Sequence, residues 1–133
     1  MSGARDGYVL AFDFGLRHIG VAVGQQITAT ASPLTTIRAR DGQPDWPALK
    51  RLIAEWAPRR LLVGLPLNMD DTDSPMAERA RAFADALARR TGVAVTLVDE
   101  RLTTRAARQH GDDDAHGRAA ALIAETWLHE QPG

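Results

Sequence analysis

The sequence predicts an α/β fold with a mixed five-stranded sheet in the order βββαβαβα and helices on both faces. Three observations predict it: β-prone segments follow one another through the first third of the chain, helical and strand-like patterns then alternate, and residues 61–65 form a continuous apolar run. Strands that are apolar along their whole length are typical of parallel sheets covered on both faces. Because the 133 residues contain neither a repeat nor a linker, we expect a single domain over residues 1–133.

The first three strands are predicted from apolar runs separated by turn residues. Residues 8–14 form the first run, and Gly15-Leu16-Arg17 separates it from the second, residues 19–23. The third stretch, residues 27–37, is rich in threonine and is interrupted by Ser32-Pro33. This interruption predicts either one strand with a break or two short strands.

The first two helices are predicted from their capping residues and from apolar residues at helical spacing. Residues 40–44 form a turn cluster, after which Asp45 is placed to cap a helix. Ser74 and Pro75 are a typical N-cap and first-turn pair, and the helix that they open is expected to end at Thr91-Gly92. The apolar residues that define the two helices are Leu49, Leu52, Ile53 and Trp56 in the first, and Ala80, Phe83, Ala84, Leu87 and Ala88 in the second.

The last third of the chain continues the alternation of strands and helices. Residues 93–98 predict a strand, residues 103–109 a short helix, and residues 118–128 a final helix. Together with residues 61–65, the segment 93–98 completes the five predicted strands.

Composition excludes several kinds of site. The chain has no cysteine, so a metal would be held by oxygen or imidazole, and a reducing compartment is expected. No apolar run approaches the roughly 18 residues that a membrane span needs, which predicts a cytoplasmic protein without a membrane partner. The net charge of −1 gives no global sign of nucleic-acid binding.

Two acidic positions are candidates for chemistry. Asp13 lies within an otherwise apolar strand, where a charged carboxylate needs a salt bridge, hydrogen bonds or a metal to compensate its burial. The pair Asp99-Glu100 follows an apolar strand directly. Because neighbouring strand residues point to opposite faces, only one of the pair can share a face with Asp13, while the other pairs with Arg101 or caps the next helix.

These carboxylates suggest a metal site at the edge of the sheet. Two carboxylates from separate strands and a third from the last helix would suit Mg²⁺ or Mn²⁺. A pair of such ions can activate water and stabilise the leaving oxygen during attack on a phosphodiester. The pattern therefore predicts a metal-dependent nuclease.

The chain resembles the YqgF/RuvX family of pre-16S rRNA nucleases, which is related to Holliday junction resolvases within the RNase H-like superfamily. The resemblance implies an RNase H-like fold and a part in processing the 5′ end of pre-16S rRNA during ribosome biogenesis. Four segments carry it in family order: Leu10-Ala11-Phe12-Asp13-Phe14-Gly15 with Ile19-Gly20-Val21-Ala22-Val23-Gly24, then Asp45-Trp46, then Val63-Gly64-Leu65-Pro66-Leu67-Asn68, and then Val98-Asp99-Glu100-Arg101-Leu102-Thr103-Thr104.

The resemblance implies that Asp13 and Glu100 are the first two catalytic and metal-binding carboxylates. At the start of the last helix, where the family pattern has aspartate, this sequence has His116. Three interpretations follow. His116 itself binds metal, Asp114 or Asp113 supplies the third carboxylate, or the acidic run only caps the helix. The sequence favours Asp114 as the third catalytic residue and metal ligand, followed by His116.

Four further residues are candidates for contact with nucleic acid. Gly15 leaves room for a phosphate near the backbone, Asn68 ends a strand, and Arg17 and Arg101 lie at predicted turns from which a guanidinium can grip phosphate. The alternative is that Asn68 shapes its loop and that the arginines are ordinary surface charges.

The expected partners are pre-rRNA and ribosomal precursor particles, and the expected state is a monomer or weak dimer. Two other functions stay open on the sequence alone. One is a resolvase-like nuclease acting on branched DNA, and the other is a catalytically silent RNA-binding module of ribosome assembly, suggested by His116.

Overall fold

The computed structural model describes residues 7–102 and 115–131, which form a mixed sheet in the order β4-β3-β2-β1-β5-β6. Strands β1 to β4 pair antiparallel, whereas β5 runs parallel to both β1 and β6. The elements are β1 (Tyr8–Asp13), β2 (His18–Gln25), β3 (Thr30–Arg40), β4 (Gln43–Pro44), α1 (Trp46–Trp56), β5 (Arg60–Leu65), α2 (Pro75–Thr91), β6 (Val95–Asp99), the short 3₁₀ helix η2 (Glu100–Leu102) and α4 (Ala115–Glu130).

The expected mixed sheet is confirmed, but the predicted count of five strands is wrong because the predicted turn contains a sixth. Asp41 and Gly42 both adopt positive φ angles and reverse the chain after β3. Gln43 and Pro44 can then pair with Arg40 and Ala39 as the two-residue strand β4. Proline is tolerated here because β4 lies at the edge of the sheet, where its missing N–H leaves no gap in a central ladder.

The interrupted third stretch forms one strand with a bulge rather than two strands. Along β2, Val21 lies opposite Thr35 and the next residue, Ala22, lies opposite Pro33. Leu34 is therefore the extra residue on β3, which is the usual form of a β-bulge. The break expected at Ser32-Pro33 is confirmed in this form.

Both predicted helix starts are confirmed by their caps. The Asp45 carboxylate accepts a hydrogen bond from the backbone N–H of Ala48 at 3.1 Å, and the Ser74 hydroxyl accepts one from Ala77 at 3.0 Å. The Ser74 hydroxyl also donates to the Pro66 carbonyl at 2.6 Å, which ties the start of α2 to the chain that follows β5. These side chains satisfy amide groups that the first helical turn leaves without partners.

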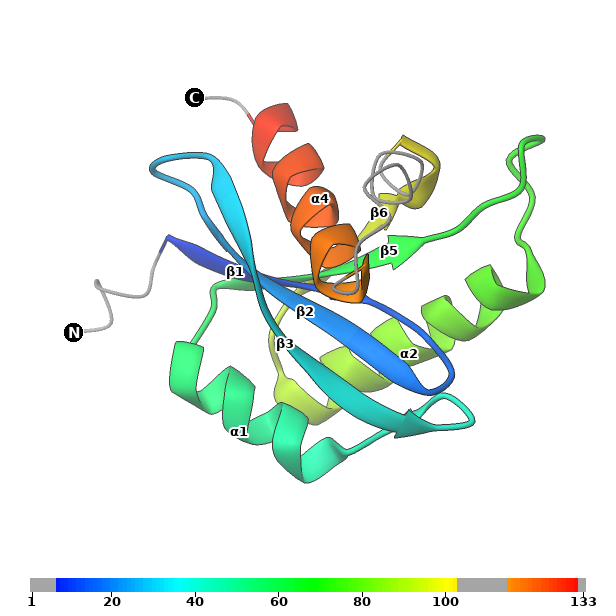
Figure 1. Cartoon of the computed structure of the whole chain (residues 1–133), viewed down its shortest axis with the longest axis horizontal. Coiled ribbons are helices and arrows are strands. Elements are labelled where there is room, and N and C mark those ends of the chain that lie inside the picture. The colour runs from blue at the N-terminus through cyan, green and yellow to red at the C-terminus, as the bar shows by residue number, and fades with distance from the viewer. Residues whose placement is uncertain (1–6, 103–114, 132–133) are drawn as a thin grey trace.

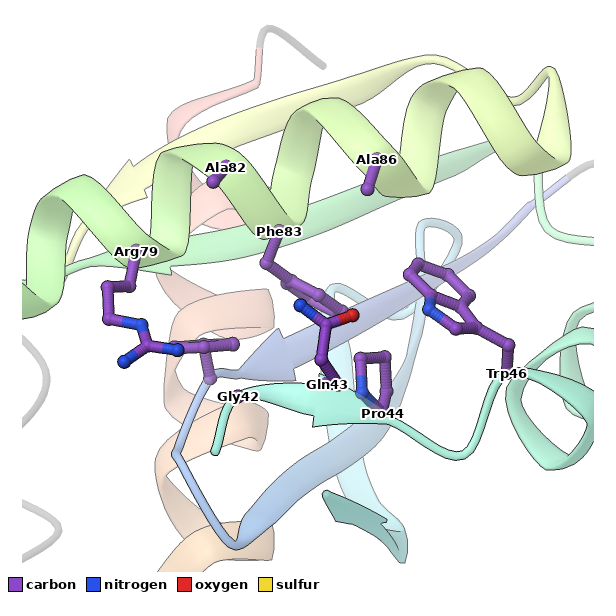
Figure 2. Close-up of a pocket in the computed structure, with 9 residues that line it drawn as sticks. Gly42, Gln43, Pro44, Trp46, Arg79, Ala82, Phe83 and Ala86 are labelled. Atoms are coloured by element: carbon purple, nitrogen blue, oxygen red, sulfur yellow. The ribbon is translucent and has the colours of Figure 1, made fainter. Parts of the chain in front are cut away.

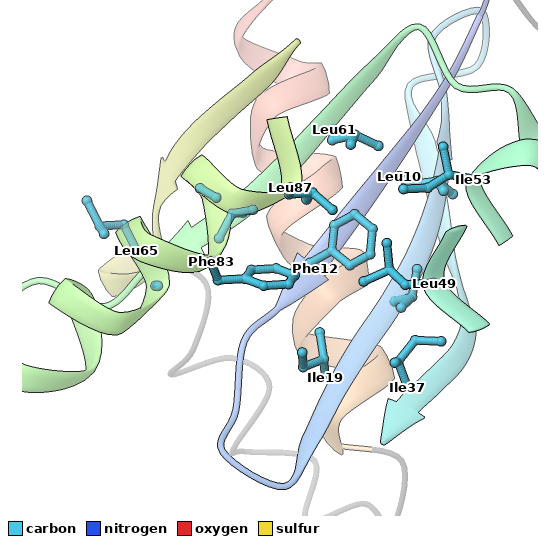
Figure 3. Close-up of a cluster of buried hydrophobic side chains, with 14 of the residues drawn as sticks. Leu10, Phe12, Ile19, Ile37, Leu49, Ile53, Leu61, Leu65, Phe83 and Leu87 are labelled. Carbon is cyan, nitrogen blue, oxygen red and sulfur yellow. The ribbon is translucent and has the colours of Figure 1, made fainter. Parts of the chain in front are cut away.

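Hydrophobic packing fixes which helix covers which face of the sheet. One face packs against α1 and α2 through a large cluster that includes Phe12, Leu49, Leu61, Phe83 and Leu87 (Figure 3). The opposite face packs against α4, and Figure 1 shows that helix on the other side of the sheet from α1 and α2. Helices on both faces are thus confirmed. The residues of the α4 cluster are Val9, Ala11, Leu62, Val98, Ile123, Ala124 and Leu128.

The end of the chain differs from the prediction in one respect. The last helix begins at Ala115, three residues before the predicted start, so that His116 belongs to its first turn. The helix predicted over residues 103–109 lies outside the described residues. Within residues 7–102 and 115–131, no helix has both the length and the apolar character that crossing a bilayer requires.

Candidate active site

Asp13 and Glu100 lie on the same face of the sheet, at the carboxyl ends of β1 and β6. Val9 and Ala11 pack against α4, so the alternation of side chains along β1 places Asp13 on the α4 face. Val98 packs against the same helix, and Glu100 follows it by two residues at the start of η2. Residues that are 87 positions apart in the sequence thus meet at one edge of the sheet.

The two carboxyl groups are buried and in contact. Asp13 has 17% of its side chain exposed, and Glu100 is 7% exposed. Burial, a hydrogen bond to Glu100 and the negative charge of Glu100 together raise the pKa of Asp13 to about 9, from an ordinary value of 3.8. The folded chain therefore brings two acidic groups together, and a proton or a bound cation would reduce the repulsion between them.

Asp99 takes the structural role that the sequence left open for one member of the acidic pair. Its carboxylate accepts hydrogen bonds from the guanidinium of Arg101, at 2.6 Å from Nη2, and from the backbone N–H of Arg101 at 2.9 Å. These bonds lower the pKa of Asp99. Because Asp99 is used in this way, Glu100 is the member of the pair that shares a face with Asp13.

Two strand glycines make the close approach of these groups possible. A Cβ atom on Gly64 of β5 would lie 3.1 Å from the carboxyl carbon of Glu100, so the missing side chain lets Glu100 lie across β5 toward β1. Gly20 pairs with Asp13, and a Cβ there would come within 2.2 Å of the carbonyl oxygen of His116. Neither glycine was predicted as a site residue, although isolated glycines in strand patterns often mark such approaches.

The third ligand predicted at the start of α4 is only partly described. The imidazole Nδ1 of His116 lies 3.9 Å from the Asp13 carboxylate, and its side chain is 52% exposed. The ring of His18 lies beside it, with ring centroids 5.6 Å apart. Asp113 and Asp114 lie outside the described residues. Among the residues that are described, no three His, Cys, Asp or Glu side chains gather into a metal-binding group.

The turn after β1 carries two of the residues predicted to contact nucleic acid. The backbone carbonyl of Arg17 accepts a hydrogen bond from the backbone N–H of Ala39. The residue is exposed. The space beside Gly15 is filled by the carbonyl of His18, which would lie 2.4 Å from an added Cβ. The turn itself therefore requires glycine, and the role of Gly15 in binding phosphate stays a prediction.

Asn68 and Arg101 are joined in one loop. The Asn68 amide donates to the Thr72 hydroxyl at 2.9 Å, and the Asn68 carbonyl accepts from the Arg101 guanidinium at 3.0 Å. Arg101 also forms ion pairs with Asp71 at 2.8 Å and Asp99 at 2.6 Å. Arg101 thus links the loop after β5 to the end of β6, beside Glu100, and its guanidinium already has several acceptors.

This arrangement predicts what replacing Arg101 will do. The logarithm of the binding constant for nucleic acid falls linearly with the logarithm of the salt concentration. Removing a side chain that contacts a phosphate reduces the magnitude of this slope by about one. Because its donors are engaged by Asp71, Asp99 and Asn68, we expect Arg101→Gln to leave that slope unchanged and to speed proteolysis and amide exchange over residues 68–72. Binding measured against salt concentration, together with hydrogen exchange, checks this. Arg17→Gln is the matched control, because Arg17 is exposed and is a proposed phosphate contact. A reduced slope for Arg101→Gln would contradict the expectation.

The fold is similar to that of the resolvase RuvC, and the chain has an RNase H-like fold. Thermus thermophilus RuvC in complex with a Holliday junction substrate aligns with a TM-score of 0.60 at 16% identity, over 90% of this chain and 91% of that one. A second structure of Thermus thermophilus RuvC gives 0.54 at 15% identity, over 93% and 97%. The similarity concerns the fold alone.

The chain belongs to the RuvX family, whose model is described as Holliday junction resolvase and matches residues 7–130. A protein of Marinobacter nauticus named "Putative pre-16S rRNA nuclease" is 50% identical, over 94% of each chain. A protein of the same name from Yersinia pestis is 47% identical, over 94% of this chain and 96% of its own length. The resemblance seen in the sequence is thereby confirmed, and the chain is a member of a nuclease family.

Proposed function

We propose that this protein is a metal-dependent nuclease that hydrolyses a phosphodiester bond near the 5′ end of pre-16S rRNA. The observation that carries the proposal is the buried contact between Asp13 and Glu100, two acids from distant parts of the chain that share one face. The choice of substrate is supported by the name of two relatives that are 50% and 47% identical to this chain, "Putative pre-16S rRNA nuclease".

The donor set fits Mg²⁺ or Mn²⁺. Both ions prefer oxygen ligands, and two carboxylates held against each other attract a divalent cation more strongly than a lone carboxylate does. Burial is the main cause of the raised pKa of Asp13, and the hydrogen bond and negative charge of Glu100 add to it. The same neighbouring charge would favour a bound cation. When bound, the metal supplies activation of a water molecule and stabilisation of the leaving oxygen.

We assign the residues of the site to two roles, metal binding and contact with nucleic acid. Asp13 and Glu100 hold the cation from β1 and η2, while Asp114 is the proposed third carboxylate and His116 the alternative ligand at the start of α4. Gly15, Arg17 and Asn68 remain the proposed contacts to nucleic acid because of their positions beside the carboxylates. For Arg101 we propose a positioning role instead, because its guanidinium is engaged by Asp71, Asp99 and Asn68.

The setting follows from the proposed substrate. With pre-16S rRNA as the proposed substrate, we propose ribosomal precursor particles as the partners, the cytoplasm as the location, and a monomer or weak dimer as the acting form.

The experiment compares two substrates at matched salt. Purified protein with Mg²⁺ or Mn²⁺ should cleave an RNA that contains the 5′ leader of 16S rRNA, and chelation of the metal should stop cleavage. A four-way DNA junction is the competing substrate, since the family model is described as a Holliday junction resolvase. Ionic strength must be equal because phosphate contacts are strongly salt-dependent.

The outcomes separate the candidate functions. Faster cleavage of the junction would replace the RNA proposal with a DNA resolvase. If neither substrate is cut and calorimetry detects no binding of Mn²⁺ that depends on Asp13, the protein is a catalytically silent RNA-binding module and the nuclease proposal fails.

A further inference from the structure

A pocket of about 100 Å³ opens on the face of the sheet opposite the carboxylates. We call it the aromatic pocket and define it by Phe14, Gln43, Trp46, Arg79, Phe83 and Ala86 (Figure 2). Drug-sized ligands usually occupy pockets of about 300 Å³ or more, so this pocket is suited to one small planar ring system. The proposed nuclease chemistry assigns it no role.

The walls of the pocket are aromatic. The ring of Phe83 lies between the other two, with its centroid 5.3 Å from that of Phe14 and 6.2 Å from that of Trp46. The planes of Trp46 and Phe83 are inclined by only 30°. These two rings therefore stack on each other, and Phe83 is buried, whereas Trp46 is only partly buried. An accessible aromatic ring can bind a planar ring by stacking, an interaction that nucleobases of any sequence can make.

The indole N–H of Trp46 is a potential hydrogen-bond donor to a ligand. Its Nε1 atom is buried, and within the described residues it has no partner. Figure 2 shows this nitrogen on the side of the ring that faces Gln43 and the pocket. A buried donor without a partner is unfavourable, so a ligand that offers an acceptor would gain affinity here. Nucleobases carry carbonyl oxygens and ring nitrogens that serve as acceptors.

Two arginine side chains lie at or near the pocket. The Arg79 guanidinium lines it and pairs with the exposed carboxylate of Asp41 at 3.3 Å. The Arg90 guanidinium lies 4.4 Å from the centroid of the Trp46 ring. A base bound between such groups would bring its own phosphate toward cations, which complements the charge of a nucleotide rather than that of a neutral aromatic molecule.

The pocket and the carboxylates lie at the same edge of the sheet. Phe14 lines the pocket and directly follows Asp13, although the two side chains belong to opposite faces. The turn between β1 and β2 joins the two places, because the backbone N–H of Gly42 in the pocket donates to the carbonyl of Leu16. A single strand that passes over this turn would meet both within a few nucleotides.

We propose that the aromatic pocket takes up one unstacked nucleobase of a single-stranded nucleic acid, stacked against the Trp46 ring and hydrogen-bonded to the Trp46 indole N–H. In one respect this rests on the proposed function, since the base belongs to the strand that the carboxylates cut. The contact holds the strand by shape and stacking, with little preference for sequence.

Nuclear magnetic resonance of the metal-free protein tests this through the indole N–H signals. The chain has three tryptophans, and the Trp46 signal is the one that Trp46→Phe removes. A short single-stranded RNA and adenosine 5′-monophosphate should both shift this signal, whereas ribose 5-phosphate, which lacks a base, should not. The signals of Trp56 and Trp127, which do not line the pocket, serve as internal references.

A variant that fills the pocket gives the decisive comparison. Ala86→Leu should weaken RNA binding about tenfold or more, as expected for the loss of a stacked base, and should abolish the Trp46 shift. Ala54→Leu adds the same side chain at an exposed position of α1 outside the pocket and should bind as the unmodified protein does. An equal shift with ribose 5-phosphate, or unchanged binding by Ala86→Leu, would overturn the proposal.

The two proposals fail in different ways. Because the resonance experiment contains no metal, a Trp46 shift without any metal-dependent cleavage would contradict the nuclease proposal alone. Metal-dependent cleavage without a shift of the Trp46 signal on addition of RNA would contradict the pocket proposal alone.

Discussion

Asp13→Asn should lower metal-dependent cleavage by about 10³-fold or more, which corresponds to about 4 kcal/mol of lost transition-state stabilisation. Asparagine keeps the size of the side chain but removes the negative charge that would hold the cation beside Glu100. The measurement is the cleavage rate of the leader RNA at saturating Mn²⁺, accompanied by calorimetric titration of the metal. We expect metal affinity and rate to fall together.

The matched control for this experiment is Asp85→Asn. Asp85 lies on the exposed side of α2, where 71% of its side chain is accessible and its ion pair is with Arg89, one helical turn away. The same chemical change at this position should leave the rate within about twofold, because exposed pairs contribute little. Equal activity of Asp13→Asn and the unmodified protein would remove Asp13 from the active site.

The metal-free protein should lose stability as pH rises from about 4 to about 9. The pKa of Asp13 is about 9 in the folded chain, against an ordinary value of 3.8, so between these values the folded state binds a proton that the unfolded state releases. The free energy of unfolding therefore falls with pH through this window, by at most about 1.4 kcal/mol per pH unit from this group. The stabilisation is complete at the acid end and is lost as pH passes the folded pKa.

Asp13→Asn isolates this contribution, because its amide mimics the neutral acid and does not titrate. Thermal unfolding in a chelator should give a variant that is more stable than the unmodified protein at pH 8 and close to it at pH 4. Mn²⁺ should stabilise the unmodified protein more as pH rises, since binding displaces the proton. Parallel pH profiles of the two proteins would contradict the raised pKa of Asp13.

Several features of the fold could be predicted because their causes are local. Asp45 and Ser74 start helices through bonds to amides three residues away, and the apolar run at residues 61–65 marks a strand covered on both faces. The edge strand β4 could not be predicted, since its two residues become a strand only when the turn at Asp41 and Gly42 returns them to β3. A two-residue segment carries no periodicity of its own.

The candidate acids can be recognised from local sequence rules. The charge of an aspartate in an apolar strand needs a compensating partner. Of two adjacent acidic residues after a strand, only one can lie on a given face of the sheet. Both rules depend only on neighbouring residues in the sequence. Tertiary packing selects Glu100 as the residue that meets Asp13, while Asp99 pairs with Arg101. It also forms the aromatic pocket beside the same turn, where the Trp46 indole N–H has no acceptor among the described residues. The physical reason is that burial, charge coupling and close backbone approach at Gly20 and Gly64 arise between segments far apart in the chain, and they exist only once the sheet and α4 have packed.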